Sequence, residues 1–282
     1  MVEGRKTATP SGVKGQCKLC LEIKYLCDSH LMPAALFRLL LSTTVTPRDP
    51  LLITPSTTFT TSRQVSDYLL CVDCEDKFRT SGEDWVLRHC YRGGKKFLLR
   101  DFVLKAKLLD DGAGATIYSA RSNPDINCSA LTFFAASVFW RAAVHKWKFP
   151  GSVPEDPIAL GPYQELLRNY LLGEEQFPQS AAMWVWISRY DKPSRCVTTP
   201  HSSRIWNCHV HTFDIPGIQF NLFIGQTIPK DVRLLCVMNG PDRPILVSEA
   251  PDDVIATQMS KISQTTRLSK ALQKKGKWSW GF

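Results

Sequence analysis

The C-terminal half of the chain alternates between hydrophobic and polar positions with a period of two. Such alternation is typical of strands with one face buried. The predicted strands are residues 205–213, 218–224, 232–238 and 245–247. Turn signals at Pro216-Gly217 and Asn239-Gly240 favour an antiparallel meander. In the first strand, His209 and His211 fall on the polar side, where they form either a solvated face or two ligands of a metal site.

The N-terminal and central parts have the three- to four-residue spacing of helices. The predicted helices are residues 34–41, 73–91, 102–109, 131–147 and 163–172. Pro33 opens the first helix, and Pro162 and Gly173 bound the last in the expected order. The Ser81-Gly82 pair is a potential break in the second helix.

The helix predicted over residues 131–147 is apolar except along one edge. Ser137, Arg141 and His145 recur every four residues, so they share that edge. A buried unpaired charge is costly, so Arg141 needs an anionic or carbonyl partner. A structural ion pair and a phosphate contact both satisfy this need.

Composition indicates a globular protein, with 44% hydrophobic and 22% charged residues in 282. The net charge of +9 favours a polyanionic partner such as nucleic acid, although a basic protein without one has the same charge. We see neither a signal segment nor an apolar run long enough to cross a bilayer, and expect a cytoplasmic protein. Reduced thiols in that compartment favour metal binding over disulfides.

Two CxxC pairs are the clearest chemical signal in the chain. They are Cys17 with Cys20, and Cys71 with Cys74. Each pair delivers two thiolates to one ion, and tetrahedral zinc takes four. The spacing therefore predicts a structural zinc site that joins both ends of the segment 21–70. Four unrelated buried cysteines are the alternative.

Between the two pairs lies His30, which is the candidate general base. Glu75 follows the last cysteine and is a candidate ligand for a catalytic divalent cation. For His30, an alternative zinc ligand or a surface imidazole remain open. Glu83, eight residues after Glu75, faces either the same groove or solvent on a helix surface.

The order of these residues resembles the zinc-containing branch of the HNH endonucleases. The matching positions are Cys17, Cys20, His30, Pro33, Leu70, Cys71, Cys74 and Lys77. The whole chain is also similar to bacterial proteins described only as HNH-endonuclease-like, through Leu160–Glu165 (LGPYxE) and Ser137–Arg141 (SxxWR). The resemblance implies a ββα-metal core and a nuclease that uses Mg²⁺ or Mn²⁺; some HNH proteins act in defence against phage.

Three positions depart from the family pattern. Ser29 stands where an acidic residue often precedes the base, with Asp28 one step earlier. Glu75 replaces the final histidine, which is acceptable because Mg²⁺ binds carboxylate oxygen. No asparagine occupies the middle position, so Gln64 or Asp67 would orient the imidazole. Asp28, Ser29 and Asp67 are therefore candidate metal-binding or orienting residues.

The sequence thus predicts an α+β protein with a zinc-stabilised ββα-metal module, a helical segment and a C-terminal antiparallel β-meander. The expected divisions are a disordered lead-in (1–15), the metal module (16–100), an α+β domain (101–258) and a basic tail (259–282). Arg141 and the tail residues Lys274, Lys275 and Lys277 are candidate nucleic-acid contacts; a disordered solubilising tail is the alternative for the lysines.

The expected activity is hydrolysis of phosphodiester bonds, with DNA as the expected substrate. The alternative is a non-catalytic, zinc-scaffolded module that binds nucleic acid or protein. The C-terminal domain is a candidate surface for a protein partner or for homo-oligomers.

Overall fold

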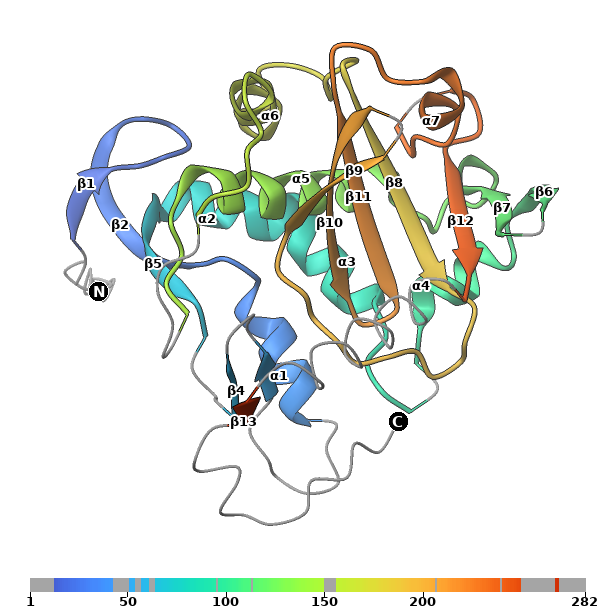
Figure 1. Cartoon of the computed structure of the whole chain (residues 1–282), viewed down its shortest axis with the longest axis horizontal. Helices are drawn as coiled ribbons and strands as arrows, with labels where there is room; N and C mark the ends of the chain where they lie inside the picture. Colours follow the sequence, from blue (N-terminus) through green and yellow to red (C-terminus); the bar gives the residue numbers. More distant parts are fainter. Residues whose placement is uncertain are drawn as a thin grey trace, which may run out of the picture.

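Two sheets of unequal size and one buried helix between them organise the chain (Figure 1). The computed structural model describes residues 13–42, 51–53, 57–60, 64–94, 96–112, 114–149, 156–205, 207–238, 240–249 and 267–268. The architecture is mixed α+β, as the sequence predicts. No helix in these ranges combines the length and the apolar character needed to cross a bilayer.

The smaller sheet belongs to the metal module and has the strand order β1-β2-β5. Its strands are β1 (Lys14–Gln16), β2 (Ile23–His30) and β5 (Ser66–Cys71), all antiparallel to their neighbours. A register shift between Leu26 and Asp28 marks a bulge in the β2–β5 pair. β1 begins at Lys14, so the predicted lead-in ends earlier than residue 15.

A nearly continuous helical segment follows β5. It consists of α2 (Val72–Phe78), the π-helix η1 (Arg79–Glu83) and α3 (Asp84–His89). The predicted break at Ser81-Gly82 is therefore a widened turn rather than an interruption. Gly82 is needed there because a Cβ atom would lie 2.8 Å from the backbone nitrogen of Phe134.

α5 (Cys128–Val144) is the central element of the fold. Phe134 and Phe139 pack against Phe213 of the large sheet, with ring centroids 6.0 and 4.9 Å apart. On another side, Trp140 meets Phe78 of α2 at 6.2 Å. A helix that is apolar nearly all round is buried on all sides, and α5 fits this rule.

The larger sheet has seven strands in the order β6-β7-β12-β8-β11-β10-β9. These are β6 (Lys107–Asp111), β7 (Thr116–Ser119), β12 (Pro244–Ser248), β8 (Ala181–Ser188), β11 (Ile218–Ile224), β10 (Cys208–Ile215) and β9 (His201–Ile205). β12 runs parallel to β8, while the other pairs are antiparallel. The strands β9, β10 and β11 form an antiparallel meander as predicted, but β12 joins β8 in parallel, so the sheet as a whole is mixed.

The remaining elements are short or peripheral. They are α1 (Ala34–Ser42), α4 (Leu98–Val103), η2 (Ala120–Ser122), α6 (Tyr163–Leu172), α7 (Lys230–Leu234) and a small sheet of β13 (Arg267–Leu268), β4 (Thr57–Thr60) and β3 (Leu51–Ile53).

Three local predictions were wrong. Residues 102–109 form the end of α4 and the start of edge strand β6, in which Leu108 pairs with Tyr118 of β7. Residues 232–238 form α7 and turns after Pro229, because a short apolar run does not distinguish helix from strand. Residues 205–213 are split between β9 and β10, where Asn207 has a φ of 62°.

Candidate functional site

The four cysteines of the two CxxC pairs come together in the metal module. Their sulfur atoms all lie within 4.8 Å of one another, and the Sγ atoms of Cys20 and Cys71 are 3.9 Å apart. Tetrahedral coordination with bonds of about 2.3 Å places two sulfurs about 3.8 Å apart, whereas a disulfide bond is about 2.05 Å long. The group can therefore hold a metal ion.

Backbone geometry positions both pairs. In the first, Leu21 has a φ of 63° and its N–H donates to the Cys17 carbonyl, which closes a tight turn. In the second, Cys71 ends β5 and Cys74 lies in the first turn of α2, so a strand-to-helix junction presents the two sulfurs. The N–H of Cys71 donates to the Cys17 sulfur at 3.3 Å and links the two turns.

The pKa shifts of the cysteine thiols are also consistent with binding of a cation at this site. The hydrogen bond from Cys74 lowers the pKa of Cys17 to about 4. The same bond and burial raise the pKa of Cys74, while burial raises that of Cys71. One thiolate thus opposes ionisation of its neighbours. A divalent cation offsets this repulsion and permits several sulfurs to ionise.

Glu75 lies beside this cluster, on the first turns of α2. Burial raises the pKa of its carboxyl group, while the Arg141 charge and a hydrogen bond with Ser29 act in the opposite direction. Its Oε1 atom is buried and has no hydrogen-bond partner among the described residues. A buried carboxylate oxygen without a partner is rare in folded proteins, and coordination of a cation would satisfy it.

Ser29 and His30 end β2 next to Glu75. Ser29 is buried, and its hydroxyl oxygen accepts the N–H of Leu70 at 3.0 Å. His30 is half-buried, and its charge has a small lowering effect on the pKa of Glu75. The predicted base and the predicted carboxylate therefore lie in the same part of the metal module.

Arg141 connects α5 to this group from the other side. Its side chain is 1% exposed; Nη1 donates to the His30 carbonyl at 2.9 Å and Nη2 to Glu83 Oε1 at 2.7 Å. The guanidinium also lies 5.4 Å from the centroid of the Phe78 ring. Because these contacts bury the charge, Arg141 is an internal ion-pair residue, and its prediction as a nucleic-acid contact was wrong.

The side chain of Glu83 points toward the interior, where it pairs with Arg141, and not toward solvent. Of the two alternatives for Glu83, its direction matches the one in which it faces inward with Glu75. At about 100° per residue, an uninterrupted α-helix would place position i+8 roughly 80° away from position i. The π-helix η1 adds one residue to the turn, which brings Glu83 back to within roughly 20° of Glu75. The inward position of Glu83 therefore follows from the widened turn, which the sequence pattern does not reveal.

The positions of Asp67 and Asp28 do not match the prediction that these residues assist His30. The Asp67 carboxylate accepts the backbone N–H of Tyr68 at 2.7 Å and contacts His145 Nε2 at 2.9 Å. Asp67 therefore orients a different imidazole. Asp28 is exposed and pairs in register with Tyr68.

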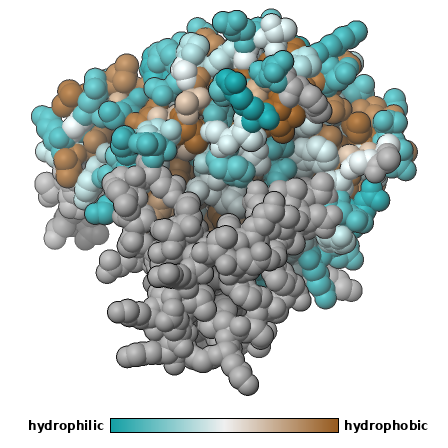
Figure 2. Space-filling view, in the orientation of Figure 1, coloured by the Kyte–Doolittle hydropathy of each residue, from teal (hydrophilic) through white to brown (hydrophobic). Residues whose placement is uncertain are grey.

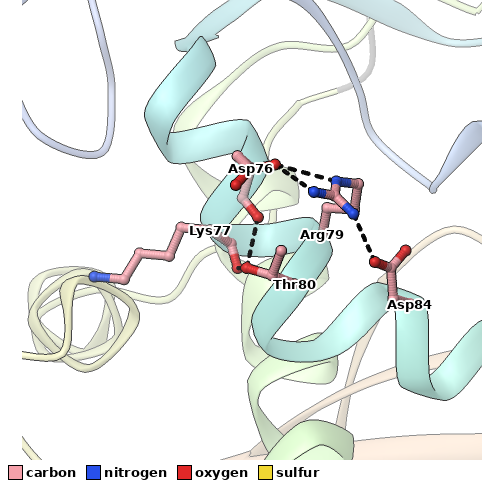
Figure 3. Close-up of polar contacts among 5 residues, drawn as sticks. All are labelled: Asp76, Lys77, Arg79, Thr80 and Asp84. Atoms are coloured by element: carbon pink, nitrogen blue, oxygen red, sulfur yellow. Dashed lines mark hydrogen bonds and ion pairs between the residues drawn. The ribbon is translucent and has the colours of Figure 1, made fainter.

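Other side chains of the helical segment α2–η1–α3 make a separate set of contacts (Figure 3). Arg79 bridges Asp76 and Asp84 at 2.5 and 2.7 Å, which braces the widened turn from outside. Lys77, one of the positions in the family resemblance, points toward α6 and donates to the Leu172 carbonyl. These side chains stabilise the helical segment that carries Glu75.

The tail candidates Lys274, Lys275 and Lys277 lie outside the described residues. Within the described part of the chain, the cysteines form the single group of three or more potential ligands close enough to share an ion. No protein-family model, curated protein or solved structure matches the chain.

Proposed function

We propose that the chain is a metal-dependent endonuclease of the HNH type that hydrolyses phosphodiester bonds in DNA. The observation that carries the proposal is the unpartnered, buried Oε1 of Glu75, the residue that directly follows the last of the four grouped cysteines. One carboxylate can suffice for Mg²⁺ in such sites, because this ion keeps several waters and binds substrate phosphate.

In this proposal each residue has a distinct role. The cysteines hold zinc, which fixes the end of β5 against the turn at Cys17 and has no part in the reaction. His30 accepts a proton from the attacking water, and Glu75 holds Mg²⁺ or Mn²⁺. That cation, when bound, offsets the charge that develops on the phosphate. Arg141 fixes the His30 backbone through its carbonyl.

The experiment is cleavage of supercoiled plasmid DNA with Mg²⁺ or Mn²⁺. His30→Ala and Glu75→Gln proteins with wild-type zinc content should be about 100-fold slower or worse, because loss of a general base costs 10²–10⁴-fold. His209→Ala is the matched control, since His209 is exposed and lies on β10. Wild-type rates for the folded His30→Ala protein would reject the proposal.

One observation favours the alternative, a non-catalytic binding module. The metal module exposes large hydrophobic side chains, among them Ile23 (63%), Val72 (65%) and Tyr25 (51%). In Figure 2, hydrophobic residues (brown) are visible at the left, where Figure 1 places β1 and β2. Exposed apolar residues of this kind are typical of protein-binding surfaces. Tight binding of a partner or of DNA, with no cleavage under any metal condition, would support this alternative.

A further inference from the structure

A second histidine in the described structure has the orienting carboxylate that His30 lacks. His145 follows the last turn of α5, and its Nε2 lies 2.9 Å from Asp67 Oδ2. The imidazole also packs edge-on against Trp147, with ring centroids 4.8 Å apart and planes at 75°. A carboxylate on one ring nitrogen and a fixed ring plane are the usual arrangement of an imidazole that transfers protons.

The register of the small sheet places this pair on the same side as Glu75. Asp67 is directly opposite Ser29 in the β2–β5 pair, and opposed residues project to the same face of a sheet. Ser29 neighbours Glu75, and Asp67 contacts His145. The imidazole of His145 therefore approaches the face that carries the candidate metal ligand.

α5 also ties His145 to the end of β2. Arg141, one helical turn earlier on the same edge, donates to the His30 carbonyl. Leu31, the residue after His30, lines a pocket with His145, Trp147, Asp156 and Thr199. His145 therefore lies close to the residue that follows His30 in the chain.

The pocket beside His145 matches a small polar group rather than a large ligand. Its volume is about 20 Å³, enough for roughly one water molecule. Among the described residues, Asp67 is the sole hydrogen-bond partner of the ring, so Nδ1 is available to a substrate. Asp156, the other acidic residue of the pocket wall, is paired with Lys146 at 2.9 Å.

We propose that His145, oriented by Asp67, is a second catalytic residue of the same reaction and acts as its general acid. This inference rests on the proposed nuclease function. His30 takes a proton from water, the hydroxide forms the new bond to phosphorus, and the bond to the leaving oxygen breaks. Protonated His145 gives its Nδ1 proton to that oxygen and keeps its Nε2–H on Asp67. Exchange with water then returns both rings to their starting states.

The test compares two substrates in the full-length, zinc-containing protein. Plasmid DNA has an alkoxide leaving group that needs a proton, whereas bis(4-nitrophenyl) phosphate releases a phenolate that does not. His145→Gln keeps a hydrogen-bond donor for Asp67 but cannot donate the catalytic proton. We expect it to slow plasmid cleavage about 100-fold or more and ester hydrolysis less than about threefold, while His30→Ala slows both.

Asp67→Asn and a matched control complete the design. Because Asp67 acts through His145, Asp67→Asn should slow plasmid cleavage, and adding it to His145→Gln should cause little further loss. His209→Gln, on an exposed imidazole, should leave both rates unchanged. Equal losses of His145→Gln on both substrates, or no loss on either, would overturn the inference. A wild-type protein inactive on both substrates would instead reject the nuclease function itself.

Discussion

The carboxylate of Glu83 and the guanidinium of Arg141 lie 2.7 Å apart, although 58 residues separate them in the chain. The pair joins the helical segment of the metal module to α5. The same guanidinium also donates a hydrogen bond to the carbonyl of His30. The candidate site is therefore built where the metal module meets α5, and residues beyond position 100 complete it.

The first prediction concerns this ion pair. Glu83→Gln leaves the Arg141 charge buried without its counter-ion, which should lower the free energy of unfolding by about 3–5 kcal/mol. Denaturant unfolding of the zinc-containing protein measures this change. Asp84→Asn is the matched control, because Asp84 is 49% exposed and its ion pair contributes about 1 kcal/mol or less. Equal stability of the two variants would contradict the structural role given to Arg141.

The second prediction concerns the close approach of η1 to α5. A Cβ atom at Gly82 would lie 2.8 Å from the Phe134 nitrogen and 3.0 Å from its Cα. Both are backbone atoms and cannot rotate away, so Gly82→Ala should lower the free energy of unfolding by about 1–3 kcal/mol. Ser81→Ala, at an exposed position of the same π-helix, is the control for helix propensity. Wild-type stability of Gly82→Ala would show that the two helices are further apart.

The third prediction is a loss of stability in mild acid. Burial lowers the pKa of His211 from 6.5 to about 4, and the charges of His209 and His201 act in the same direction. In the unfolded chain the His211 imidazole binds a proton near pH 6.5, whereas in the folded chain it does so near pH 4. The stabilisation is therefore fully present above pH 6.5 and is lost as pH falls to 4, by roughly 3 kcal/mol.

The measurement is the free energy of unfolding at pH 7 and pH 4.5. His211→Asn should reduce its pH dependence, whatever its effect at neutral pH, since the titrating group is removed. His209→Asn, at an exposed position, should retain most of the wild-type dependence. An unchanged pH dependence in His211→Asn would mean that another group causes the acid sensitivity.

The sequence correctly predicted those elements whose ends are set by residues at the ends themselves. α6 begins after Pro162 and ends at Gly173, which has a φ of 80°, as the order of these two residues indicates. The β10–β11 hairpin turns at Pro216-Gly217 as expected, with Ile215 opposite Ile218. By contrast, alternation places His211 on a polar face, yet it is buried beside Phe139 of α5. Its burial depends on packing between distant elements, which alternation cannot reveal.

The candidate site also combines features that the sequence predicts with features that it does not. The CxxC spacing predicted four grouped sulfurs, and the structure brings them together. The four-residue recurrence of Ser137, Arg141 and His145 correctly indicated a shared edge, but not its partners. Glu83 and Asp67 lie 58 and 78 residues from Arg141 and His145. Contacts over such distances are set by the tertiary fold.

The fourth prediction concerns the metal, on which the proposed site depends. Removing one sulfur leaves too few ligands to hold the two turns together, so Cys74→Ser should lose the ion and much of its stability. Cys27→Ser, at a half-buried cysteine outside the group, is the matched control and should retain the ion.

The zinc content of the purified full-length protein, measured by mass spectrometry of the dialysed sample, tests the metal module most directly. We expect one zinc ion per chain in the wild type and in Cys27→Ser, and none in Cys74→Ser. A folded wild-type chain without bound metal, or zinc retained at full occupancy in Cys74→Ser, would contradict the four-cysteine site.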